Sequence, residues 1–235
     1  MPSLTKGRLL KNRSHTKRFS ARRSAPSLSL EVRQTLPGGE KKRHMKKRIK
    51  AVIFDYGLTI GCEYYFNKPH PEITNWSELI QEIAFRDTGF SEKWMKGELR
   101  TQDIAEEISN RTSVSCAEIE EFLRIGCQSI KENAEVVAFA RYLKKNHFPI
   151  AMVTVNFDIF NEVIIPFHGY AEVFPVIVNS CDFGTFDKSS LWPIAFSKMN
   201  PVVNYDDCLL IEDKESEIDK FIGHGGQAIH YTGER

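Results

Sequence analysis

Polar side chains that suit phosphoryl transfer stand next to four separate segments of the chain. They are Asp55, Thr154, Lys188 and the neighbouring acids Glu212 and Asp213. A carboxylate can attack phosphorus and form an acyl phosphate, while a hydroxyl group and an ammonium group can stabilise charge on phosphoryl oxygens. Three neighbouring carboxylates repel one another unless a divalent cation lies between them, and oxygen ligands of this kind favour Mg²⁺. These residue types therefore suit Mg²⁺-assisted phosphoryl transfer, provided that the fold brings them together.

The segment around Asp55 is the most informative one. The apolar residues 51–54 precede Asp55, Gly57 stands two residues after it and Thr59 four residues after it. An aspartate at the carboxyl end of a buried strand lies where open α/β sheets place their active sites. Taken alone, the segment also fits a strand whose last residue only begins a turn, so the downstream residues must decide between the two interpretations.

An alternation of short apolar runs and helical segments predicts the elements that position these residues. Strands are predicted at 51–55, 149–155, 173–178, 208–211 and 228–231, and helices at 134–145, 158–167, 189–199 and 215–224. This alternation predicts an α/β fold with a doubly wound parallel sheet. Because the carboxyl ends of parallel strands lie on one edge, the five polar residues are expected to converge there.

The part between the first two strands is predicted to be helical throughout. Helices are expected from 75 or 77 to about 87, from 98 to 111 and from 115 to 130, where apolar residues recur at helical spacing. We therefore predict a helical cap at 61–133 inserted into a core formed by 45–60 and 134–235. Residues 61–74, which contain two prolines, form a linker. In it, Tyr64, Tyr65 and Phe66 either line a substrate pocket or simply pack in the linker.

Taken in order, these segments resemble the motifs of the haloacid dehalogenase (HAD) superfamily. Its first motif, Asp-x-Asp-x-Thr after an apolar strand, corresponds to Asp55-Tyr56-Gly57-Leu58-Thr59, and its second, Thr or Ser often followed by x-Asn, to Thr154-Val155-Asn156. The third, a lysine before a helix, corresponds to Lys188 without the usual proline, and the acidic fourth to Glu212-Asp213. The resemblance covers about residues 50–232. Each motif alone is weak, but all four in order, with a helical insert after the first, are specific.

The resemblance implies a Rossmann-like core, Mg²⁺, an aspartyl-phosphate intermediate and hydrolysis of a small phosphomonoester. It assigns catalysis to Asp55, Thr154 and Lys188, substrate binding to Thr59 and Asn156, and metal binding to Asp55, the carbonyl of Gly57, Glu212 and Asp213.

Gly57 is the main departure from the family pattern. The aspartate that the family has at this position is also the general acid/base, a role that commonly contributes about 10²–10⁴-fold to the rate. Members that resemble this Asp-x-Gly version include active sugar-phosphate phosphatases, so inactivity does not follow. A carboxylate of the cap or a water molecule is an alternative proton donor.

Three functions remain in competition. The first is a Mg²⁺-dependent phosphatase acting on a small phosphorylated metabolite. The second is a weakly catalytic or inactive protein with a HAD-type fold that serves as a binding or regulatory partner. The third is a halide-releasing dehalogenase, which Glu212 and Asp213 disfavour because uncompensated acids oppose an anionic substrate. The sequence identifies neither the substrate nor the oligomeric state.

The first 44 residues differ in charge from the remainder. They hold 12 Lys/Arg and two acids, a net +10, so the remainder carries −9 within a whole-chain charge of +1. Such a segment binds nucleic-acid or membrane phosphates, directs import into an organelle, or is missing from the mature protein. We favour the third interpretation, because Met45 and the basic residues 46–50 resemble a bacterial start directly before the first strand. A nucleic-acid function would rest on residues 1–44 alone, which we expect to be disordered.

The remaining bulk features favour a cytoplasmic protein. The five cysteines are odd in number, widely spaced and without a CxxC pair, which favours a reducing compartment over a disulfide framework. No apolar run approaches the roughly 20 residues that a membrane span requires. We therefore expect no membrane partner.

Overall fold

The computed structural model describes residues 48–86 and 88–233, which belong to one compact unit built around a five-stranded sheet. The strands are β1 (Ala51–Phe54), β2 (Ile150–Thr154), β3 (Val176–Asn179), β4 (Cys208–Glu212) and β5 (Gln227–His230). They pair in the order β3-β2-β1-β4-β5, and all four pairings are parallel. The predicted doubly wound parallel sheet is thereby confirmed. The predictions for residues 1–44 fall outside the described residues.

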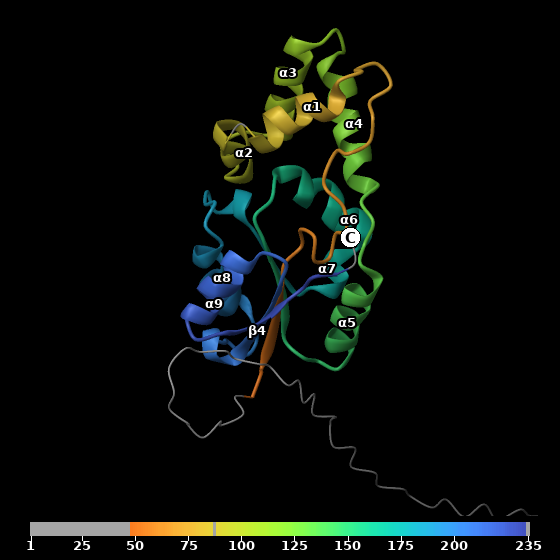
Figure 1. The fold of residues 1–235 in the computed structure, drawn as a ribbon. Helices are drawn as coiled ribbons and strands as arrows, with labels where there is room; N and C mark the ends of the chain where they lie inside the picture. The colour runs from red at the N-terminus through yellow and green to blue at the C-terminus, as the bar shows by residue number, and fades with distance from the viewer. Residues whose placement is uncertain (1–47, 87, 234–235) are drawn as a thin grey trace, which may run out of the picture. The chain divides into compact units, whose positions relative to one another are not determined.

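Helices cover both faces of the sheet, as its apolar strands require. Alternate residues of β1 face opposite ways: Val52 and Phe54 join one apolar cluster, and Ala51 and Ile53 join another. The first cluster includes residues of α5 (Ala134–Lys145), η2 (Phe160–Ile164) and α7 (Tyr170–Val173). The second includes residues of α8 (Lys188–Lys198) and α9 (Glu215–Gly223). In Figure 1, α5 and α7 accordingly lie on one side of the sheet and α8 and α9 on the other.

The chain between β1 and α5 forms a helical insert, as predicted. Its elements are α1 (Trp76–Gln81), η1 (Glu82–Arg86), α2 (Thr88–Met95), α3 (Thr101–Arg111) and α4 (Cys116–Gln128). A capping box begins α4, where the amide of Glu118 donates to Ser115 Oγ at 3.4 Å and the amide of Ser115 donates to Glu118 Oε2 at 3.1 Å. Figure 1 shows the insert beyond the end of the sheet, and its apolar residues join the cluster of β1, α5 and α7.

Two local predictions were wrong. The strand predicted at 173–178 begins only at Val176, because Tyr170–Val173 form α7 and Pro175 has no amide hydrogen for a strand ladder. Helix α2 was not predicted, since Gly89 lowers the helical propensity of its first turn. The remaining short elements are α6 (Ile165–His168), η3 (Ser180–Asp182) and η4 (Tyr205–Asp207). Among the described residues, no helix combines the length and the apolar character that crossing a bilayer demands.

Buried hydrogen bonds attach the insert to the loops that follow β2 and β3. The carboxylate of Asp158 accepts from Trp94 Nε1 at 2.8 Å and from the amide and hydroxyl of Thr101 at 3.0 and 2.7 Å. Ser180 Oγ donates to the carbonyl of Met95 at 2.7 Å. These loops leave the carboxyl ends of their strands, so the insert is held over the edge of the sheet where an active site is expected.

Gly97 permits this close approach, and its replacement should loosen it. Gly97 has a φ of +71°, and a Cβ there would lie 2.4 Å from the carbonyl oxygen of Cys181. Gly184 has a similar φ of +63° but open space around the same position. Both alanine variants incur the left-handed backbone cost of roughly 1–2 kcal/mol, and only Gly97→Ala adds the clash, which typically costs about 1–3 kcal/mol more. We expect urea unfolding to show a lower free energy of unfolding for Gly97→Ala than for Gly184→Ala. Equal losses would show that the contact at Cys181 does not constrain the insert.

Candidate active site

The sheet brings the predicted residues of β1 and β4 side by side. Phe54 and Ile211 are register partners in these neighbouring strands, and the next residues along the chain are Asp55 and Glu212. The amide of Asp55 also donates to the carbonyl of Ile211 at 3.0 Å. Chain order reverses between β1 and β4, and such switch points form the ligand crevices of open α/β sheets. Asp55 and Glu212 therefore flank the expected binding position.

Lys188 lies between these two carboxylates. Its ammonium nitrogen is 2.6 Å from Asp55 Oδ1 and 2.7 Å from Glu212 Oε2. The relative exposures of Asp55, Lys188 and Glu212 are 4%, 6% and 1%. Lys188 is the first residue of α8, rather than preceding the helix as predicted, and the Asp187 side chain caps that helix by accepting from the amide of Ser189 at 3.1 Å.

The ionisation of these groups reflects their burial. Burial and repulsion by Glu212 raise the pKa of Asp55 to about 7, although Lys188 pulls it down. Burial opposes the charge of Lys188, but attraction by Asp55 and Glu212 outweighs this and raises its pKa above the usual value. The ammonium thus stays charged at neutral pH, where Asp55 is poised between its two forms.

The acids also form a candidate metal centre. One carboxylate oxygen each of Asp55, Glu212 and Asp213 lies within 4.8 Å of the others. Three hard oxygen donors around one point suit Mg²⁺, and a bound cation would offset the burial and the repulsion by Glu212 that raise the pKa of Asp55. The donor set therefore fits the metal that the sequence predicted.

Gly57 lies in a tight turn directly after Asp55. The carbonyl of Tyr56 accepts from the amides of Ile60 and Gly61, both at 2.9 Å, and Leu58 adopts a left-handed φ of 53°. A Cβ built on Gly57 would lie 3.8 Å from Asp55 Oδ2, with nothing nearer. An aspartate at residue 57, which the family pattern has and this chain lacks, would therefore start next to the candidate nucleophile Asp55.

The other predicted residues are all buried, and the structure brings only some of them together. Thr154 ends β2, and its hydroxyl lies 3.5 Å from Asn156 Nδ2. Asn156 Nδ2 also donates to the hydroxyl of Tyr65 at 2.6 Å. Thr59 is fully buried, and its hydroxyl has no hydrogen-bond partner among the described residues. The roles predicted for these side chains remain predictions.

Two further contacts hold the acidic pair and were not evident in the sequence. The amide of Lys214 donates to Glu212 Oε1 at 3.2 Å, which fixes one oxygen of that carboxylate. His230 Nε2 lies 2.9 Å from the carbonyl oxygen of Asp213. Neither composition nor spacing reveals a contact between the ring of His230 and a backbone group 17 residues away.

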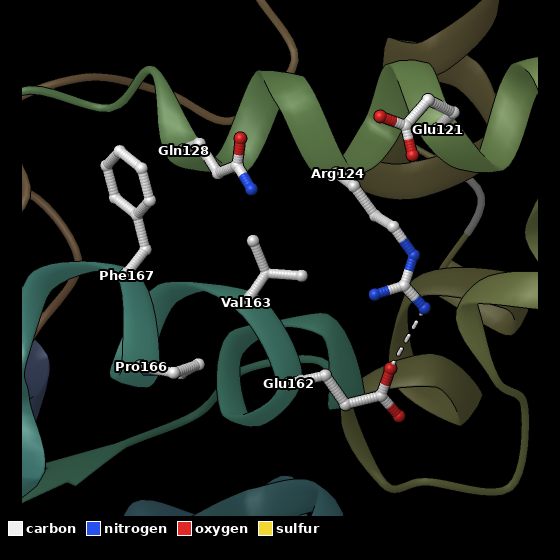
Figure 2. A pocket seen from close by; sticks show the side chains of 7 residues that line it. All are labelled: Glu121, Arg124, Gln128, Glu162, Val163, Pro166 and Phe167. Carbon is white, nitrogen blue, oxygen red and sulfur yellow. Dashed lines mark hydrogen bonds and ion pairs between the residues drawn. The ribbon is translucent and has the colours of Figure 1, made fainter.

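A surface hollow of about 400 Å³ lies elsewhere, between α4 and the segment formed by η2 and α6. Its lining is Glu121, Arg124, Gln128, Glu162, Val163, Pro166 and Phe167, as Figure 2 shows. The ion pair between Arg124 and Glu162 spans it at 3.2 Å. None of the predicted site residues borders this hollow.

Comparisons with solved structures establish the fold. An enzyme of the HAD family from Bacteroides thetaiotaomicron, solved with magnesium and inorganic phosphate, has a TM-score of 0.57 at 12% identity, covering 80% of this chain and 96% of its own. A predicted HAD-like hydrolase from Porphyromonas gingivalis has a TM-score of 0.56 at 11% identity, covering 77% and 90%. The 2-haloacid dehalogenase of Pseudomonas syringae has a TM-score of 0.56 at 18% identity, covering 80% and 89%.

The chain therefore has the haloacid dehalogenase-like fold, as its motifs predicted. No protein-family model matches the sequence, and no curated protein matches it significantly. The fold is thus established by the structural likeness, and the activity must be argued from the site.

Removing the ammonium group of Lys188 should destabilise the metal-free protein. In Lys188→Met, two buried carboxylates lose their compensating charge, and breaking a buried ion pair typically costs about 3–5 kcal/mol. Lys220→Met is the matched control, because Lys220 also pairs with two acids, Glu217 and Asp187, but is 47% exposed. Its loss should cost less than about 1 kcal/mol. Urea unfolding in EDTA measures both values, and similar small losses would contradict the importance of the buried group.

Proposed function

We propose that this chain is a Mg²⁺-dependent phosphatase of small phosphomonoesters. The observation that carries the proposal is the convergence of Asp55, Lys188, Glu212 and Asp213 at the carboxyl edge of the sheet. One structural relative was solved with magnesium and inorganic phosphate, which supports the same ligands here.

Asp55 is the proposed nucleophile. One of its oxygens bonds to phosphorus while the ester oxygen leaves with its bonding electrons, and water then attacks the aspartyl phosphate to release phosphate. Lys188 and Thr154 would donate hydrogen bonds to phosphoryl oxygens as negative charge develops on them. Mg²⁺, held by Asp55, Glu212, Asp213 and the carbonyl of Gly57, would supply further positive charge to these oxygens.

The acidic character of the site favours this reaction over dehalogenation. The single positive charge of Lys188 does not balance three carboxylates within 4.8 Å of one another, so they repel a haloacid anion unless a further cation is present. Some structural relatives are dehalogenases, so the fold alone does not separate the two reactions. A weakly catalytic binding protein is the alternative, because Gly57 supplies no acid.

The helical insert is the proposed cap. Its contacts with Asp158 and Ser180 hold it over the edge of the sheet where Asp55 lies. Asp55, Thr154, Lys188 and Glu212 are all buried, so a substrate reaches them only if residues above the site move aside. The residues of the cap would then select the substrate, which we expect to be a small phosphorylated metabolite.

The affinity for Mg²⁺ should rise with pH through neutrality. A proton on Asp55 competes with the metal, and a pKa of about 7 means that the ionised fraction grows from about one-tenth at pH 6 to about nine-tenths at pH 8. Isothermal titration calorimetry should accordingly show affinity about tenfold higher at pH 8. Asp55→Asn should remove most of this dependence. A wild-type affinity that stays constant over this range would contradict the assignment of Asp55 as a ligand.

Hydrolysis of p-nitrophenyl phosphate tests the function directly. Its good leaving group needs no proton, so the absence of a carboxylate at residue 57 should not prevent turnover. We expect hydrolysis with Mg²⁺, loss in EDTA and loss by at least about 10³-fold in Asp55→Asn, because the nucleophile is removed. A folded protein that binds Mg²⁺ without turnover would instead support the non-catalytic alternative.

A further inference from the structure

A phosphatase built on this site needs a proton donor for poor leaving groups, and Gly57 cannot provide one. The donor must be a side chain that keeps its proton at neutral pH and lies beside the phosphate-binding residues. Tyr65 meets both conditions. Its hydroxyl oxygen accepts a hydrogen bond from Asn156 Nδ2 at 2.6 Å, and the same nitrogen lies 3.5 Å from Thr154 Oγ1.

The hydrogen bond with Asn156 leaves the phenolic hydrogen of Tyr65 available. Asn156 Nδ2 is the donor in this bond, so the Tyr65 oxygen uses a lone pair and its O–H is not engaged there. The backbone of Asn156 is itself fixed, because its backbone N–H donates to Ser180 Oγ at 2.9 Å. The contact therefore orients the hydroxyl without consuming its proton.

Aromatic packing fixes the ring of Tyr65. Its centroid lies 5.4 Å from that of Phe157 in an edge-on contact, 5.7 Å from Phe66 and 6.4 Å from Tyr56. A phenol held on three sides loses little further entropy when it contacts a substrate. Packing of this kind also fits a residue that only fills the linker, so the contact that points to the site is the hydrogen bond with Asn156.

The surroundings also keep the phenol protonated. Burial, with smaller contributions from Tyr56 and from the carboxylate of Asp55, raises the pKa of Tyr65 well above its ordinary value. An alkoxide is more basic than an ordinary phenolate, so an alkoxide leaving group is the kind of base that can take a proton from a tyrosine.

We propose that Tyr65 donates the proton to the leaving oxygen of the substrate, in place of the carboxylate that Gly57 lacks. The inference rests on the proposed phosphatase function. As Asp55 bonds to phosphorus, the bond between phosphorus and the ester oxygen breaks, and that oxygen takes the Tyr65 proton to become an alcohol. Water then attacks phosphorus, gives one proton back to the Tyr65 phenolate and frees Asp55. The sum is ester plus water giving alcohol plus phosphate, with Tyr65 and Asp55 regenerated.

The test compares leaving groups in Tyr65→Phe, which keeps the ring and removes only the hydroxyl. Glycerol 2-phosphate has a poor leaving group that needs the proton, and p-nitrophenyl phosphate has one that does not. We expect kcat/KM for glycerol 2-phosphate to fall by about 10²-fold or more, and that for p-nitrophenyl phosphate by less than about threefold. Tyr64→Phe is the matched control, because Tyr64 is 60% exposed, and both substrates should retain wild-type rates.

A second variant adds a rescue. A Cβ at residue 57 has room, with Asp55 Oδ2 as its nearest neighbour at 3.8 Å, so Gly57→Asp places a carboxyl group beside the nucleophile. In the Tyr65→Phe background, Gly57→Asp should raise kcat/KM for glycerol 2-phosphate at least about tenfold above that of Tyr65→Phe alone. The control is Gly57→Asp in the wild-type background, where Tyr65 still acts and the gain should be less than about threefold. An equal gain in both backgrounds would contradict the role of Tyr65.

The outcomes separate the inference from the function on which it rests. Equal losses with both substrates, or no loss with either, would overturn the role of Tyr65 and leave the phosphatase intact. A wild-type enzyme that hydrolyses only p-nitrophenyl phosphate would also overturn it, since no donor would then be acting. Hydrolysis of neither substrate, or hydrolysis that survives in Asp55→Asn, would overturn the proposed function and this inference together.

Discussion

The ammonium group of Lys188 between two buried carboxylates is the interaction on which the site depends. Asp55 and Glu212 follow register partners in neighbouring strands, so the sheet itself forces two acids together. Burial of like charges is costly unless an opposite charge is supplied with good geometry. The contacts of 2.6 and 2.7 Å supply it, and they require α8 to begin at the residue where it does. The register of β1 and β4 sets where the two acids lie, and the start of α8 must then place Lys188 between them.

A single positive charge does not fully balance three acids, and this imbalance gives the site its chemical character. Burial and repulsion by Glu212 raise the pKa of Asp55 even with Lys188 in contact. A carboxylate in this condition gains from any further cation, and a negatively charged phosphoryl group gains from the same positive charges. The same excess of buried negative charge therefore explains both the raised pKa of Asp55 and the proposed binding of a metal ion.

The sequence predicted the parallel sheet and the convergence of Asp55, Lys188, Glu212 and Asp213, and the reasons are local. Apolar runs of four or five residues end in polar groups at β1, β2 and β4, and parallel pairing then forces those ends together. The predicted start of β3 was wrong because the apolar run at 173–178 begins with the last residue of α7, a helix that packs on the sheet. The contacts of Asp158 and His230 could not be predicted, since each joins segments far apart in the chain through one hydrogen-bonding group. The geometry around Tyr65 likewise depends on how the linker folds back on Asn156.

The two faces of the sheet differ in what they share with the insert. Apolar residues of the insert form one continuous cluster with the face that contacts α5 and α7, whereas α8 and α9 pack in a separate cluster. Helix α4 packs against η2 and α2 against η3, and Asp158 adds buried polar contacts with the insert. An insert grafted from a relative would leave apolar side chains of this shared cluster poorly packed. If the insert selects the substrate, as proposed, substitution within it changes that choice at less cost to the shared apolar cluster than its replacement does.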